Sequence, residues 1–128
     1  SEISPLLEFS INSAINKFKS NYKNYLKNLS EIDLSKGLIV WGTGSIGTQY
    51  AVDASWGKSD VFYVDINKSA HGLVLSSSGH EIHDPNIIKK VKPQNILIAS
   101  AWENDVKEQL EPFCHGGEKI LTFSDLLN

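Results

Sequence analysis

The chain contains no arginine, since all 12 of its basic residues are lysines. It therefore lacks the planar guanidinium group that holds phosphates and carboxylates with two parallel hydrogen bonds, and an anion site must use backbone amides, lysines or helix N-termini. A single cysteine, Cys114, excludes an internal disulfide and a cysteine-rich zinc site. No apolar run exceeds a few residues and no secretory leader precedes the first expected helix, so we expect a cytoplasmic protein without a membrane span.

The size and composition are those of one globular domain, or of one domain with an appendage. The sequence has 128 residues, of which 41% are hydrophobic and 21% charged, so a core can form. A net charge of −3 argues against non-specific nucleic-acid binding. The chain contains no methionine and begins Ser1-Glu2. We therefore expect it to be a piece of a larger protein, although processing can also remove an initiator methionine.

The N-terminal segment has the pattern of a long helix over residues 4–29. Ser4 can cap it, Pro5 suits its first turn, and apolar residues recur in steps of four and three. Two alternatives stay open for this apolar stripe: it packs against its own domain, or it forms a seam with another helix, in a homodimer or in the rest of the parent polypeptide. We expect residues 1–35 to form this helix and a linker, and residues 36–128 to form the folded domain.

The rest of the chain alternates between strand and helix patterns, which predicts an α/β fold with a parallel sheet. A four-stranded sheet of order 2-1-3-4 is expected, a Rossmann-like half domain preceded by the long N-terminal helix. A hairpin of Leu73–Leu75 against Glu81–His83 is expected in the crossover. The expected strands are 38–41, 60–65, 95–100 and 119–123, and the expected helices are 46–56, 85–91 and 103–110, with a last turn at 124–127.

A glycine-rich motif, Gly42-Thr43-Gly44-Ser45-Ile46-Gly47, lies between the first expected strand and the next helix, where a dinucleotide-binding fingerprint has to be. Its first glycine permits a tight turn, its second lets a phosphate approach the backbone, and its third allows close helix packing. Asp65 ends the second expected strand, where an acid accepts hydrogen bonds from ribose hydroxyls and repels the 2′-phosphate of NADP. The motif predicts a nucleotide site, and the alternative is a Rossmann scaffold that has lost its ligand.

Three further residues are expected near this site. Ser100 ends the third expected strand, and Ser100 and Trp102 face the glycine loop from the rim at the point where the strand order reverses. Two alternatives stay open for His71, which follows Asp65 by six residues: it reaches the ligand edge, or it simply forms the turn. We assign no catalytic residue, because no nucleophile and base are expected to converge. We assign no metal site either, because His80 and His83 lie on a probable strand and point to opposite faces.

The segment from Gly37 to Phe123 resembles a Rossmann-like module of bacterial sugar and surface-polysaccharide enzymes. The matching pieces are IVWGTGSIG, VFYVDINKSAHG, HEIHDPNII and NILIAS. The run is similar to the N-terminal nucleotide-sugar-binding domain of sugar acyltransferases and to the C-terminal domain of the sugar C-methyltransferase family. This resemblance implies a nucleotide or nucleotide-sugar site lined by the motif glycines and Asp65, with His71 and Ser100 nearby.

Three functions are therefore expected, in this order. The first is a nucleotide or nucleotide-sugar binding module of a carbohydrate-modifying methyltransferase or acyltransferase, whose transferase chemistry belongs to another part of the parent protein. The second is an NAD-binding regulatory or oxidoreductase fragment. The third is a non-catalytic assembly module that dimerises through the N-terminal helix. The cofactor itself is left open between a nucleotide-sugar and an NAD-type nucleotide.

Overall fold

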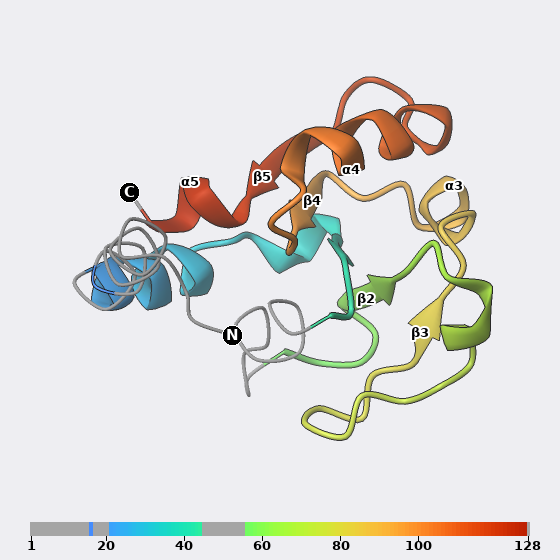
Figure 1. Ribbon diagram of the computed structural model, residues 1–128, viewed down its shortest axis with the longest axis horizontal. Helices are drawn as coiled ribbons and strands as arrows, with labels where there is room; N and C mark the ends of the chain where they lie inside the picture. The colour runs from blue at the N-terminus through green and yellow to red at the C-terminus, as the bar shows by residue number, and fades with distance from the viewer. Residues whose placement is uncertain (1–15, 17–20, 45–55, 128) are drawn as a thin grey trace, which may run out of the picture.

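The computed structural model of the chain describes residue 16, residues 21–44 and residues 56–127. Its centre is a sheet of five strands, β1 (Leu38–Trp41), β2 (Val61–Val64), β3 (Ile82–His83), β4 (Asn95–Ile98) and β5 (Lys119–Thr122). Figure 1 shows the sheet running through the middle of the molecule, with helical segments on its two sides. Every strand pair is parallel. The prediction of an α/β fold with a parallel, Rossmann-like sheet is confirmed.

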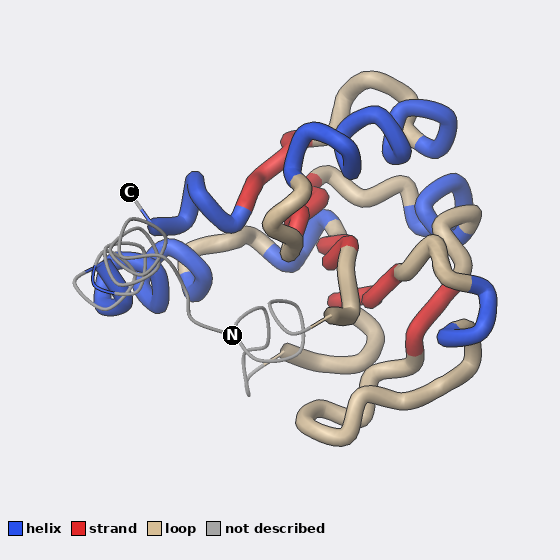
Figure 2. The backbone as a smooth tube through the Cα atoms, viewed as in Figure 1, coloured by secondary structure: helices blue, strands red, loops and turns tan. Residues whose placement is uncertain are grey.

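The strand order is β3-β2-β1-β4-β5, so the expected four-stranded sheet is corrected to five strands. The four predicted strands keep their predicted mutual order, and the additional strand β3 pairs with the outer side of β2. The expected hairpin is present as an antiparallel bridge between Val74 and Glu81, and the Ile82 amide also donates to the Leu73 carbonyl at 2.8 Å. Ile82 and His83 in addition pair in parallel with Tyr63 and Val64, which joins this arm of the hairpin to the sheet as β3. Figure 2 shows most of the crossover that precedes β3 as loop.

The strand sequences alternate between two buried faces. Leu38 and Val40 of β1 pack into one core, and Ile39 and Trp41 pack into the core on the opposite face. Because side chains point alternately up and down along a strand, an unbroken apolar run needs both faces covered. All of β1 is buried, as this requires.

Helices cover the two faces of the sheet. On the face of Ile39 and Trp41 lie α3 (Ile87–Val91) and α4 (Glu103–Leu110), which contribute Ile88, Val106 and Leu110 to the core. On the other face lie α5 (Phe123–Leu127) and the helix of residues 21–30. Three short 3₁₀ turns, η1 (Leu34–Lys36), η2 (Lys68–Ala70) and η3 (Glu111–Phe113), complete the described elements.

The helix of residues 21–30 packs on the chain's own sheet. Tyr25 and Leu29, four residues apart on one helix face, are 1% and 2% exposed in the core. The Tyr25 ring lies 5.3 Å from that of Phe123, and the Asn28 side-chain amide donates to the Leu126 carbonyl at 2.9 Å. Figure 1 accordingly shows this blue helix beside red α5. The expected helix over 4–29 thus ends at residue 30, and most of its earlier part lies outside the described residues, as does the expected helix from about Ile46.

The register brings the strand ends together. Trp41 is level with Val64 of β2 and with Ile98 of β4, and Ile98 is level with Thr122 of β5. The residues that follow these strands therefore meet at one edge of the sheet. No helix in the described part of the chain is both long enough and apolar enough to traverse a bilayer.

Candidate functional site

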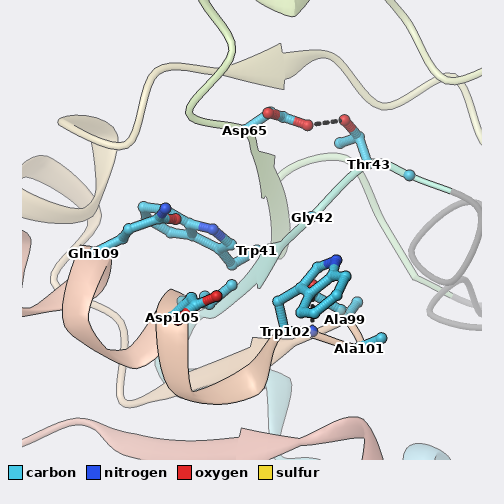
Figure 3. A pocket seen from close by; sticks show the side chains of 12 residues that line it. Trp41, Gly42, Thr43, Asp65, Ala99, Ala101, Trp102, Asp105 and Gln109 are labelled. Atoms are coloured by element: carbon cyan, nitrogen blue, oxygen red, sulfur yellow. Dashed lines mark hydrogen bonds between the residues drawn. The ribbon is translucent and has the colours of Figure 1, made fainter.

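A pocket of about 440 Å³ opens at the carboxyl edge of the sheet, over the ends of β1, β2 and β4. In open parallel sheets ligands bind at this edge, where the strand order reverses, and here the reversal lies between β1 and β4. Figure 3 shows the pocket between the turn after β1, Asp65 after β2, and α4. It is lined by Trp41, Gly42, Thr43, Gly44, Asp65, Ala99, Ser100, Ala101, Trp102, Asp105, Val106 and Gln109.

The turn after β1 requires glycine at Gly42. Its φ is +117°, and a Cβ built on it would lie 2.7 Å from the carbonyl oxygen of Ala99. The neighbouring backbones are held to this approach, since the Gly42 amide donates to the Val64 carbonyl at 3.0 Å and the Ala99 amide donates to the Trp41 carbonyl at 2.9 Å. Gly42 therefore turns the chain tightly between β2 and β4, as the motif predicts.

The presence of glycine at position 44 has a different explanation. Among the described residues a Cβ on Gly44 would meet nothing within 4 Å, and the φ of Gly44 lies outside the left-handed region. Neither backbone strain nor packing in the described part of the chain explains a glycine here. The missing side chain leaves the backbone of this pocket-lining residue open to close approach, which is the role that the motif predicts for its second glycine.

Asp65 follows β2 and faces the glycine turn. One of its carboxylate oxygens accepts a short hydrogen bond from the Thr43 hydroxyl, and the other accepts from the Asn67 amide at 2.9 Å. The first contact ties the end of β2 to the turn after β1, as Figure 3 shows. A carboxylate oxygen has more than one lone pair, so both oxygens retain capacity to accept from a ligand. The acid thus anchors the turn and also lines the pocket.

Ser100 lies in the pocket wall after β4, as predicted, and its hydroxyl accepts from the Trp102 amide at 3.1 Å. This contact orders the turn into α4. His71 is not among the residues that line the pocket. Its Nε2 donates to the Asp65 carbonyl at 2.7 Å, and its Nδ1 lies 3.7 Å from Asp84. The ring therefore supports the backbone of Asp65 rather than the ligand side of its carboxylate.

The remaining predicted residues of the motif, Ser45, Ile46 and Gly47, lie outside the described residues. Five of the predicted site residues that the structure does describe line one pocket: Gly42, Thr43, Gly44, Asp65 and Ser100. Their role toward a ligand stays a prediction.

The sequence places Trp102 at the rim, but the rest of the wall formed by α4 was missed. Asp105 and Gln109 line the pocket from one face of this helix, and Trp102, at the start of the helix, stands at the rim with 73% of its surface exposed. The signal is their spacing of three and four residues, which places them on one helix face. The described lining carries two carboxylates, those of Asp65 and Asp105, and no lysine.

A second polar cluster lies away from the pocket, in the turn before β5. The Glu118 side chain is 1% exposed; it accepts from the amides of His115 and Gly116, both at 2.9 Å, and lies 3.0 Å from the His115 ring. Burial alone would raise the pKa of Glu118, but the amide hydrogen bonds hold it below its usual value. Burial first, and then the adjacent Glu118 carboxylate, raise the pKa of the Cys114 thiol to about 11. A thiol with so high a pKa is largely protonated at neutral pH, which makes Cys114 a poor nucleophile.

Comparison with known proteins gives similarity at the level of solved structures only. No family model matches the chain, and no curated protein does. One similar structure is that of RSP, a Rex-family repressor, with a TM-score of 0.47 and 19% identity over 88% of this chain and 67% of that one. Another is RSP in complex with beta-NADH, with a TM-score of 0.48 and 20% identity over 88% and 66%. The expected kinship with sugar transferases receives no support from these comparisons.

Proposed function

We propose that the protein binds a nucleotide in the pocket at the carboxyl edge of its sheet. The phosphates lie against the backbone of the turn that follows Gly42, where Gly44 permits close approach, and the ribose hydroxyls donate to Asp65. The observation that supports this most is that the turn and the acid line one pocket at the β1–β4 reversal. Backbone amides suit a chain without arginine, because they hold phosphate without a cationic side chain.

Among nucleotides, the pocket favours an NAD-type ligand over its 2′-phosphorylated counterpart. Asp65 at the ribose end accepts hydroxyl hydrogens, and its charge repels a 2′-phosphate. The described lining offers no lysine to offset that repulsion. The beta-NADH bound by RSP makes NADH the first ligand to test. We propose that the ligand regulates the protein of which this module is part, which is the second of the functions expected from the sequence.

Isothermal titration calorimetry tests the proposal with NADH, NADPH and UDP-glucose. We expect NADH to bind and NADPH to bind about 10-fold or more weakly, which corresponds to about 1.4 kcal/mol of charge repulsion. Gly44→Val should abolish NADH binding, because its side chain fills the space that the phosphate needs. Gly117→Val is the matched control, since Gly117 has only ordinary neighbours and lies outside this pocket. No heat from any ligand at millimolar concentration would sink the proposal.

A second candidate function is self-association through the N-terminal helix. Tyr22 and Leu26 are 42% and 46% exposed, although Tyr25 and Leu29 of the same helix are buried. The exposed pair lies four residues apart and extends the apolar stripe around the helix. Deleting residues 1–30 would remove two core residues, so a surface substitution is the cleaner test. Light scattering should show a smaller mass for Leu26→Lys than for the unaltered chain, and equal masses would count against this role.

A further inference from the structure

We propose that the α4 wall of the pocket selects the base of the nucleotide, and that it takes a base carrying an exocyclic amino group, such as adenine. Asp105 accepts from that amino group, Gln109 bonds the adjoining base edge, and Trp102 covers one face of the ring. This inference rests on the proposed nucleotide site and names the specificity-determining residue within it. It disfavours a uridine nucleotide, because uracil has an oxygen where this wall requires a donor.

The wall has unused hydrogen-bonding capacity. In the part of the chain that the structure describes, the Asp105 and Gln109 side chains make no hydrogen bond or ion pair, whereas both oxygens of Asp65 have partners. Asp105 and Gln109 are four residues apart on α4, so their side chains are neighbours on one helix face. Figure 3 shows both directed from α4 toward the pocket, with Asp105 between the two indole rings in this view.

The chemistry of the pair determines which base edge fits. An ionised carboxylate only accepts hydrogen bonds, so Asp105 needs an N–H group opposite it. A side-chain amide both donates and accepts, and glutamine accordingly pairs with the amino and ring nitrogens of adenine. A carbonyl oxygen in place of the amino group would face the carboxylate oxygen of Asp105, and the two acceptors would repel each other. The wall therefore accepts an amino base and discriminates against an oxo base.

The Trp102 indole at the rim of the pocket stacks on every base in a similar way. Trp102 leaves 73% of its surface exposed at the residue that precedes α4, three residues before Asp105. Stacking of a base on an aromatic ring depends little on which base it is, because every base has a π face. Trp102 therefore contributes to affinity, and Asp105 contributes to the choice of base.

Three 5′-monophosphates that differ at one ring position test this division. AMP carries the amino group, purine riboside 5′-monophosphate has hydrogen there, and IMP has oxygen. We expect AMP to bind about 10-fold more tightly than either analogue, the scale of a good contact between a side chain and a base edge. Asp105→Asn should reduce that preference to less than about 3-fold. Trp102→Ala should weaken all three ligands by a similar factor and keep the preference for AMP.

Glu108→Gln is the matched control, because it removes one carboxylate from the same helix without touching the pocket lining. It should retain the full preference for AMP. Equal affinities of the three monophosphates, or a preference that survives Asp105→Asn, would overturn the base assignment and leave the nucleotide site standing. Absence of binding by all three, together with NADH, would instead overturn the proposed function itself.

Discussion

The close approach of β4 to the turn after β1 makes Gly42→Ala the most informative substitution for the fold at the site. The added Cβ would lie 2.7 Å from the Ala99 carbonyl oxygen, closer than carbon and oxygen can pack. The alanine must also keep a φ of +117°, a backbone conformation that residues other than glycine rarely adopt. Strain at such a φ and overpacking each cost on the order of 1–3 kcal/mol, so we expect the free energy of unfolding to fall by about 2–6 kcal/mol.

Gly72→Ala separates the two contributions. Gly72 has a φ of +87° but nothing within 4 Å of a built Cβ, so its substitution carries the conformational cost alone, about 1–3 kcal/mol. Urea denaturation followed by circular dichroism measures both variants, with Gly44→Ala as the neutral reference because it has neither constraint. A Gly42→Ala variant no less stable than Gly72→Ala would refute the reasoning from the Ala99 contact.

Three further predictions concern Asp65 and the turn before β5. Asp65→Ala should lower the free energy of unfolding by about 1–3 kcal/mol and should also lower the affinity for NADH. Thr43→Val should lower mainly the free energy of unfolding. Urea denaturation measures the stability and calorimetry the affinity, and normal NADH binding by Asp65→Ala would contradict the prediction. Iodoacetamide should alkylate Cys114 at pH 8 about 100-fold more slowly than in the unfolded chain, because burial and Glu118 raise its pKa to about 11; equal rates would refute that environment. Because the folded-state pKa of Glu118 is lowered, its stabilising contribution is present above the unfolded value of about 4.3 and is lost as pH falls through the folded value. Glu118→Gln should therefore cost about 1–3 kcal/mol at pH 7 and progressively less below pH 4 in urea denaturation, and a cost independent of pH would argue against the buried carboxylate.

The central strands β1 and β4 were predictable because every residue in them is buried. The run Leu38–Trp41 is apolar at every position, and the structure confirms it residue for residue. Ile82–His83 was expected as part of a hairpin, but its parallel pairing with β2 was not predicted. Its pairing depends on the free outer edge of β2, which is a tertiary property that no local pattern encodes.

The residues at the two ends of the pocket also differ in whether the sequence could predict them. Gly42 and Asp65 were identifiable because strand, glycine turn and acid recur at fixed spacing, and the register then brings them to one edge. Asp105 and Gln109 were missed because polar residues on a helix do not reveal which of them face a pocket and which face water. Nearness of His71 to Asp65 in sequence does not specify the side from which its ring approaches, and in the structure the ring bonds the Asp65 backbone carbonyl.

The most direct test of the nucleotide site is a two-dimensional ¹H–¹⁵N NMR titration with NADH. We expect the amide signals of Thr43 and Gly44, and the indole signal of Trp102, to move with one common saturation curve, because all three residues line the pocket. The Gly117 amide, in the distant turn before β5, should stay in place. Signals that remain unchanged around Gly44 at millimolar NADH, or that move only outside the pocket, would contradict the account.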